Sequence, residues 1–132
     1  MTTYQYEPLP GTDQKHIRLL QLLPGCEEDP VRCSIQAEHI DNVPRYEAVS
    51  YVWGDRSDTA EVLCHGMPLS VPANLVDALQ RFRKKTDPRM LWADAICIDQ
   101  KNIKERGEQV PLMGKIFEGA KRVLVWLGRG ED

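Results

Sequence analysis

Met90-Leu-Trp-Ala-Asp-Ala-Ile-Cys-Ile98 is a nearly continuous apolar run, and it decides the fold class. Such runs form strands that other elements cover on both faces, as in the centre of a parallel sheet. We therefore predict a buried strand over residues 90–98. Asp94 is the only charged residue of the run. Burial of a carboxylate costs free energy unless hydrogen bonds or a counter-charge compensate, so Asp94 needs partners.

A helix and a strand follow this run. An apolar stripe at helical spacing predicts the helix, and it consists of Val110, Met113, Phe117 and Ala120. Pro111 is comfortable only in a first turn, so we start the main helix near residues 108–110 and leave 102–107 as a loop or separate turn. Asn102 and Glu105 also have the spacing of a capping box, which leaves an earlier start open. Val123–Leu127 predicts the last strand.

The residues before the run predict further strands and one clear helix. Tyr46–Trp53 is rich in β-branched and aromatic residues and predicts a strand. Ala60–His65 and Met67–Val71 flank a glycine and predict a short hairpin. Pro72–Lys85 predicts a helix, whose apolar face comprises Leu75, Ala78, Leu79 and Phe82. Strands that alternate with helices in this order predict an α/β fold with a parallel sheet core.

The first 45 residues predict a β-hairpin. Ile17–Leu23 is a strand pattern that Pro24-Gly25 ends, and Cys33–Ile40 predicts a returning strand. We therefore divide the chain into an N-terminal strand or hairpin extension, 1–45, and a core, 46–132.

Composition excludes several classes of protein. The 132 residues carry a net charge of −3 with a pI near 5.6, so the basic surface of a nucleic-acid-binding protein is missing. The N-terminus has no signal-peptide pattern, and no apolar run is long enough to span a bilayer. We therefore expect a cytoplasmic protein with no membrane partner. The four cysteines form no C-x-x-C pair, so we expect free thiols and no metal site.

Three ordered motifs resemble those of the HET (heterokaryon incompatibility) domains of fungi. Tyr46-Glu-Ala-Val-Ser-Tyr-Val-Trp-Gly54 resembles the opening signature, and Leu91-Trp-Ala-Asp-Ala-Ile-Cys-Ile-Asp-Gln100 resembles the second. The third motif is spread over Glu105-Arg106, Gln109-Val110, Met113 and Val123–Gly128. Asp99 departs from the asparagine common in the family, and Pro111 is a less usual residue there.

The resemblance implies a role in fungal non-self recognition and programmed cell death, with features of innate immunity. HET domains are similar to Toll/interleukin receptor (TIR) domains, which are flavodoxin-like and signal by self-association. The resemblance therefore implies a TIR/flavodoxin-like parallel sheet core with helices on its faces. It also implies protein partners, either further copies of the chain or other signalling proteins.

Some TIR domains also cleave NAD, with a glutamate on the helix that follows the third sheet strand. The resemblance therefore makes NAD a candidate substrate, although no cofactor is implied with certainty. The third such strand here is Val123–Leu127, and the chain ends soon after it. We accordingly expect a core that is incomplete at its C-terminus and inactive as this chain.

Six residues are candidate site residues, five within the motifs and Asp55 directly after the first motif. Asp94 and Glu105 are the candidate catalytic carboxylates, because cleavage of a glycosidic bond needs a carboxylate beside an oxocarbenium-like centre. Each also has a structural interpretation, Asp94 as an acid held by backbone N–H groups or by Arg106, and Glu105 as an exposed capping residue. The candidate cofactor-binding residues are Trp53, Gly54, Asp55 and Arg106.

The roles of those four residues follow from their chemistry. Trp53 can stack on a base or pack in the core, and Gly54 permits a turn that other residues resist. Arg106 can hold a phosphate bidentately. A phospho-receiver domain shares this element order and would use Asp94 as its acceptor. Its acidic pair after the first strand and its lysine after the last strand are missing from this sequence.

Overall fold

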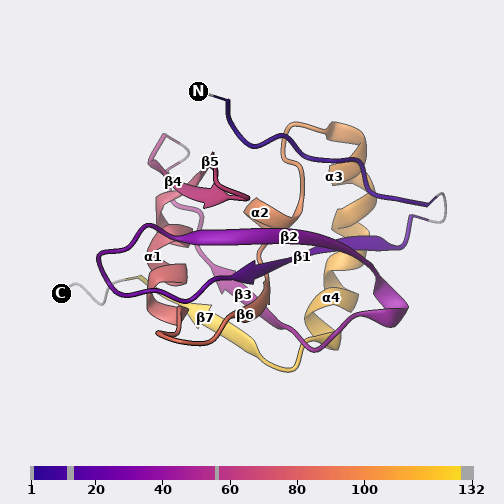
Figure 1. The fold of residues 1–132 in the computed structure, drawn as a ribbon. Helices are drawn as coiled ribbons and strands as arrows, with labels where there is room; N and C mark the ends of the chain where they lie inside the picture. The colour runs from indigo at the N-terminus through magenta and orange to yellow at the C-terminus, as the bar shows by residue number, and fades with distance from the viewer. Residues whose placement is uncertain (1, 12–13, 56, 129–132) are drawn as a thin grey trace.

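The computed structural model describes residues 2–11, 14–55 and 57–128. Within them the chain folds into a seven-stranded sheet with the strand order β5-β4-β2-β1-β6-β3-β7 (Figure 1). The strands are β1 (His16–Leu22), β2 (Arg32–His39), β3 (Glu47–Tyr51), β4 (Thr59–Cys64), β5 (Met67–Pro72), β6 (Arg89–Trp92) and β7 (Val123–Trp126). The helices are α1 (Ala73–Phe82), α2 (Asp94–Cys97), α3 (Ile103–Gln109) and α4 (Met113–Gly119), with 3-10 turns η1 (Ile40–Asn42) and η2 (Val110–Leu112).

The sheet is mixed, with a parallel part at one side. β6, β3 and β7 are parallel neighbours, so the predicted parallel core is correct for these three strands. β1 pairs antiparallel with both β2 and β6, and the β4–β5 hairpin extends the sheet beyond β2. Residues 16–39 therefore form two inner strands of the sheet. The division of the chain at residue 45 stays a prediction.

The predicted strand over residues 90–98 is wrong in its second half. β6 ends at Trp92, and the chain turns into α2 at Asp94. The amides of Ile96 and Cys97 donate to the carbonyl of Ala93, at 3.1 and 2.8 Å. A helical turn that is buried on every side is as apolar as a buried strand, so the sequence pattern does not distinguish them.

The predicted helix start near residues 108–110 is also wrong. α3 begins at Ile103, because the Asn102 side chain accepts the Glu105 amide at 3.0 Å and caps the helix. Pro111 lies in the 3-10 turn between α3 and α4, where its missing N–H costs no α-helical hydrogen bond. The capping pattern was therefore the better guide to where this helix begins.

The helix predicted at residues 72–85 is confirmed as α1, although it ends at Phe82. Arg83 follows the helix with extended backbone, and its guanidinium donates to carbonyls of the β1–β2 loop, among them Asp29 at 3.1 Å and Pro30 at 3.0 Å. No helix in the part of the chain that the structure describes combines the length and apolarity needed to cross a membrane.

Helices cover both faces of the parallel strands. Phe82 of α1 packs edge-on against Trp126, and Phe117 of α4 packs edge-on against Trp92. Trp92 is in register with Ala48 of β3, whereas Trp126 is in register with Tyr51. Residues three apart in a strand point to opposite faces. The two contacts therefore place α1 and α4 on opposite faces of the sheet.

Candidate functional site

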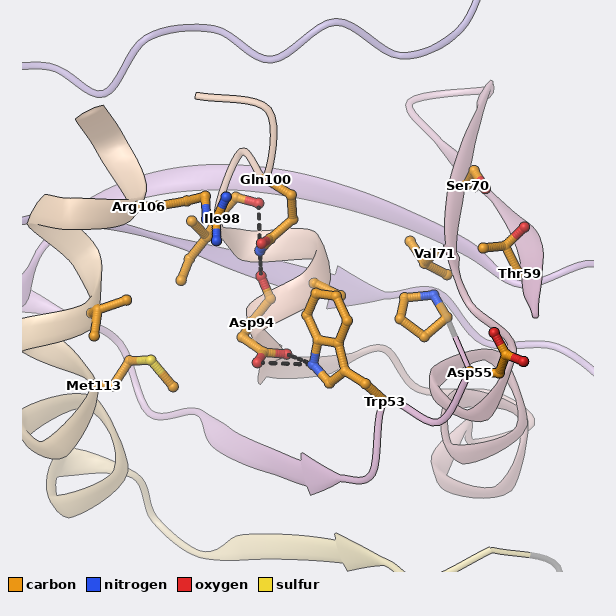
Figure 2. A pocket seen from close by; sticks show the side chains of 13 residues that line it. Trp53, Asp55, Thr59, Ser70, Val71, Asp94, Ile98, Gln100, Arg106 and Met113 are labelled. Carbon is orange, nitrogen blue, oxygen red and sulfur yellow. Dashed lines mark hydrogen bonds between the residues drawn. The ribbon is translucent and has the colours of Figure 1, made fainter. Parts of the chain in front are cut away.

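A cavity of about 520 Å³ lies between the β4–β5 hairpin and the segment from α2 to α4 (Figure 2). It contains four of the six candidate residues, three from separate motifs and one from the turn directly after the first motif. They are Trp53, Asp55, Asp94 and Arg106. The other lining residues are Thr59, Ser70, Val71, Pro72, Ala95, Ile98, Gln100, Val110 and Met113.

The Asp94 carboxylate is held in this cavity by neutral donors. The Tyr51 hydroxyl donates to Asp94 Oδ1 at 2.9 Å, and Trp53 Nε1 donates to Oδ2 at 3.1 Å. Burial, and after it the negative charge of Asp94, raises the pKa of Tyr51, so the hydroxyl keeps its proton. Asp94 forms no ion pair among the residues that the structure describes. Its negative charge therefore remains available to a ligand.

Backbone contacts hold the neighbouring loops in place. Gln100 Nε2 donates to the carbonyls of Asp94 at 2.8 Å and Ile98 at 3.3 Å. Gly54 has φ +73°, and a Cβ added there would lie 3.0 Å from Asn74 Nδ2. That amide donates to the Val52 carbonyl at 3.0 Å. Gly54 therefore acts on the cavity through the turn after Trp53, since its own backbone is not part of the lining.

Arg106 and Asp55 bring opposite charges to the cavity. Arg106 is exposed, and no hydrogen bond or ion pair within residues 2–11, 14–55 and 57–128 holds its guanidinium. Asp55 is also exposed, and hydrogen bonds from the Ser57 amide and hydroxyl lower the pKa of its carboxyl. A free guanidinium and a fixed carboxylate on opposite sides of one cavity (Figure 2) suit a ligand that has an anionic group at one end and hydroxyl donors at the other.

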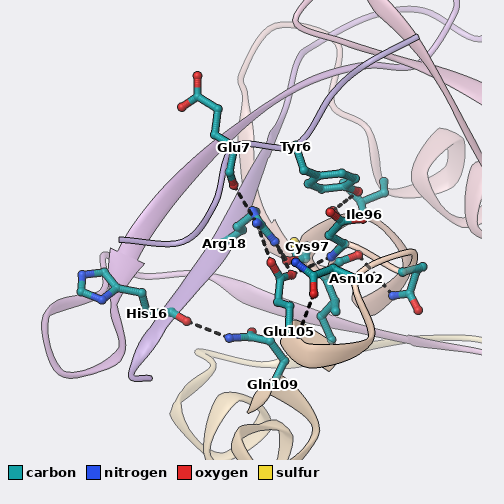
Figure 3. Close-up of polar contacts among 12 residues, drawn as sticks. Tyr6, Glu7, His16, Arg18, Ile96, Cys97, Asn102, Glu105 and Gln109 are labelled. Atoms are coloured by element: carbon teal, nitrogen blue, oxygen red, sulfur yellow. Dashed lines mark hydrogen bonds and ion pairs between the residues drawn. The ribbon is translucent and has the colours of Figure 1, made fainter. Parts of the chain in front are cut away.

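Glu105, the other candidate catalytic residue, is not part of the lining of this cavity, and its side chain lies beside Arg18 (Figure 3). Its carboxylate is 6% exposed and accepts two hydrogen bonds from the Arg18 guanidinium, at 2.5 and 2.8 Å. It also accepts the Asp99 amide at 2.7 Å. The structure therefore separates the two candidate carboxylates: Asp94 lines the cavity, and Glu105 ties α3 to β1.

Arg18 is a residue that sequence reasoning missed. It is 3% exposed, and it also donates to the carbonyls of Cys97 at 3.2 Å and Glu7 at 2.8 Å. The Tyr6 ring lies 4.9 Å from its guanidinium carbon. The available signal was a charged residue within the apolar strand Ile17–Leu23, the same signal that singled out Asp94.

Gln109 is a second buried polar residue of α3. The structure shows it 2% exposed, with its Nε2 donating to the His16 carbonyl at 2.8 Å. It therefore ties the end of α3 to the start of β1, in parallel with the contact between Glu105 and Arg18.

Comparison with known proteins identifies the family. The family model of the heterokaryon incompatibility protein (HET) matches residues 46–132. The chain belongs to the HET family. It is 35% identical over 144 aligned residues to heterokaryon incompatibility protein 6, OR allele, of Neurospora crassa. That alignment covers 98% of this chain and 21% of the relative, so the chain spans about a fifth of that protein's length. No solved structure matches the chain.

The HET match contains the three motifs found in the sequence. In the structure they supply β3 and the turn after it, β6 with α2, and α3 through β7. The first two motifs contribute Trp53 and Asp94 to the cavity, and the third contributes Arg106. Much of the remaining motif sequence builds strands and helix faces, as the buried residues Val49, Trp92 and Ile96 illustrate.

Proposed function

We propose that this chain is a recognition module of fungal heterokaryon incompatibility. In this role it contributes to non-self recognition and programmed cell death by associating with further copies of itself or with a partner protein. The observation that carries the proposal is the 35% identity to heterokaryon incompatibility protein 6 across 98% of the chain. The chain spans only 21% of that relative. That this chain shares the role of the whole relative is therefore also part of the proposal.

An exposed apolar edge supports the proposed mode of action. β7 lies at the end of the strand order and pairs with β3 alone within the described sheet. Val123 and Val125 alternate along it and Leu127 directly follows it, and the three residues are 42%, 58% and 88% exposed. An edge strand that combines unpaired backbone groups with exposed apolar side chains is a template for pairing with another chain. We call these three residues the β7 edge.

Sedimentation velocity over a wide range of concentrations tests this proposal. We expect the sedimentation coefficient to rise with concentration for the wild type and to stay at the monomer value for Val125→Lys. The matched control is Ile103→Lys, which replaces an 80% exposed residue of α3 and should associate like the wild type.

Expression in fungal cells separates self-association from partner binding. A monomeric wild type that still causes cell death, with the death abolished by Val125→Lys, supports binding of a partner at the β7 edge. A chain that is monomeric at high concentration and causes no death on expression contradicts the proposal.

The cavity supports a second candidate, a TIR-like NAD nucleosidase. The parallel strands have the order β6-β3-β7, with the first strand in the chain at the centre, which is how a flavodoxin-like sheet begins. Trp53 and Asp94 follow the carboxyl ends of β3 and β6. Open α/β sheets bind ligands at this end of their strands. These observations support a TIR-like arrangement with a ligand in the cavity.

The chemistry assigns a role to each cavity residue. Cleavage between nicotinamide and ribose develops positive charge on the sugar, which the Asp94 carboxylate would stabilise. Trp53 would stack on a planar ring, and Arg106 would bind the pyrophosphate. Glu105 takes no part in this version, because Arg18 and the Asp99 amide occupy its carboxylate.

Calorimetric titration with NAD tests the second candidate, with nicotinamide release followed in parallel. We expect binding without turnover in this chain. Arg106→Ala should weaken the binding roughly tenfold or more, in line with the loss of a charge-assisted contact. Lys104→Ala removes an exposed cation from the same helix and serves as the control. If millimolar NAD gives neither heat of binding nor nicotinamide, the candidate is excluded.

A further inference from the structure

Two buried cysteines face each other across neighbouring strands. Cys33 of β2 and Cys64 of β4 are register partners in a parallel pair, and they are 2% and 0% exposed. Register partners project to the same side of a sheet, and neighbouring strands lie about 4.7–4.9 Å apart. That spacing is within the Cα separation of about 4.4–6.8 Å that a disulfide requires. The backbone therefore places the two Cα atoms at a separation that a disulfide can span.

The two thiols influence each other. The neighbouring Cys64, and after it burial, raises the pKa of Cys33. Because a thiolate is the form that reacts with oxidants, one thiol of the pair acts as the nucleophile and the other as the resolving thiol. We take Cys64 as the nucleophile, because the Tyr4 ring stacks on the next residue, His65, and Cys64 therefore lies beside the segment that can open.

The pair lies at a narrow junction of the sheet. β2 and β4 are joined by two register pairs, Arg32 with Leu63 and Cys33 with Cys64, whereas β4 and β5 share six. Beyond this junction the β4–β5 hairpin carries Thr59 and the residues 70–72, which form one wall of the cavity. Within the sheet, that wall is therefore attached to β2 by a short junction, and the two cysteines form one of its two register pairs.

We propose that Cys33 and Cys64 form a reversible disulfide that locks the β4–β5 hairpin, and with it one wall of the cavity, to the central sheet. The oxidant is a hydroperoxide. The Cys64 thiolate attacks its O–O bond, becomes a sulfenic acid and releases an alcohol, or water from hydrogen peroxide. The Cys33 thiol then displaces the sulfenic oxygen as water. Two thiols lose two electrons in total, and the peroxide gains them.

The N-terminal segment controls access to the pair. Tyr4 donates its amide to the Pro68 carbonyl at 2.9 Å, and its ring stacks on His65 with the ring centres 5.6 Å apart. It packs against the buried cluster that contains both cysteines. The segment around it has no helix or strand and runs along the outside of the molecule (Figure 1). Release of Tyr4 is therefore the local opening that admits a peroxide to Cys64.

Peroxide treatment of the folded chain, followed by alkylation of free thiols and peptide mass mapping, tests the proposal. We expect one linked peptide pair, which joins Cys33 to Cys64 and disappears on reduction. Amide exchange in β4 should slow roughly tenfold in the oxidised chain, because its junction with β2 no longer opens. Tyr4→Ala should speed disulfide formation roughly tenfold, and Tyr4→Phe, which keeps the ring, should leave the rate unchanged.

Matched cysteine variants complete the test. Cys33→Ala and Cys64→Ala should each abolish the linked peptide, whereas Cys97→Ala removes another buried thiol and should retain it. Mapping of the wild type needs no variant, so it decides the matter even if an alanine variant fails to fold. The proposal is overturned if peroxide oxidises the exposed Cys26 while Cys33 and Cys64 stay reduced, or if they become linked only after unfolding.

Discussion

Glu105 and Arg106 are neighbours in the sequence, and their side chains serve different parts of the molecule. Arg106 lines the cavity, whereas Glu105 is buried against Arg18. The motif marks both positions as candidate site residues, but it does not show which way each side chain points. Arg18 and Glu105 are 87 positions apart, so no local pattern reveals their pairing. Asp94 shows the same limit: its need for partners was predictable, and the choice of Tyr51 and Trp53 was not.

The ion pair between Arg18 and Glu105 predicts a large and non-additive effect on stability. Glu105→Gln leaves the Arg18 charge buried without a counter-charge, so we expect it to cost about 3–5 kcal/mol of unfolding free energy in urea. The double variant Arg18→Met/Glu105→Leu removes both charges and should cost clearly less than the sum of the two single changes.

The exposed pair of Lys104 and Glu108 on the same helix is the matched control, and its removal should change the stability by less than about 0.5 kcal/mol. If the loss of unfolding free energy in the double variant equals the sum of the losses in the two single variants, the side chains of Arg18 and Glu105 do not interact in solution.

At the scale of elements, the sequence predicts what a segment buries better than the shape it takes. β1, β2, β4, β5 and α1 were predicted with small shifts of their ends, because turn residues and apolar periodicity specify them locally. The segment after Trp92 was predicted as strand because it is buried on all sides, and the tertiary packing makes it a helical turn. Two sequence signals gave different starts for α3, the Asn102 cap an early one and Pro111 a late one. The structure follows the Asn102 cap.

Glu47 joins the first ends of the three parallel strands. It begins β3, and its carboxylate binds Arg89 at the start of β6, at 2.6 Å, and Arg122 just before β7, at 3.2 Å. The hydrogen bond from Arg89, followed by the charges of Arg89 and Arg122, lowers the pKa of Glu47 in the folded state. The unfolded chain therefore binds this proton at a higher pH than the folded chain does.

This difference predicts how stability changes with pH. The stabilisation from Glu47 is fully present above the unfolded pKa of about 4.3, and it is lost as the pH falls through the lower folded pKa. We expect Glu47→Gln to cost about 1–2 kcal/mol near neutral pH. The difference in unfolding free energy between this variant and the wild type should then disappear in acid. Urea unfolding as a function of pH measures it.

Glu61→Gln, at an exposed position of β4, is the control and should run parallel to the wild type at every pH. If Glu47→Gln remains less stable than the wild type at a pH so low that carboxylates are protonated, the effect comes from packing rather than from charge.

At the scale of the whole molecule, the sequence predicted the order of the elements but not the place of the first strands. The alternation of strands and helices specifies the parallel strands β6, β3 and β7. Nothing local indicates that β1 enters the sheet beside β6, because that pairing joins residues about 70 positions apart, such as Leu20 and Leu91. The β1–β2 hairpin therefore links the parallel strands to the β4–β5 hairpin.

The central place of β1 predicts that residues 46–132 do not fold alone, although the family model begins at residue 46. Without residues 1–45, the edge of β6 loses its partner, and Glu105 loses Arg18. The β4–β5 hairpin also loses β2, the one strand outside the hairpin that pairs with it in the described part of the chain. Leu19 and Leu20 are fully buried, and their removal takes away apolar burial of about 1.5–3 kcal/mol for each side chain. That loss is large beside the total stability of a domain, which is about 5–15 kcal/mol.

The measurement is amide dispersion in the NMR spectrum of fragment 46–132, together with its urea unfolding curve. We expect narrow dispersion and no cooperative transition, and we expect both to be restored when a peptide of residues 1–45 is added. The same peptide with Arg18→Met is the control for the buried ion pair, and it should restore folding only at higher peptide concentration because Glu105 then stays unpaired. Cooperative unfolding of the fragment by itself would instead make residues 46–132 an autonomous core and residues 1–45 an accessory extension.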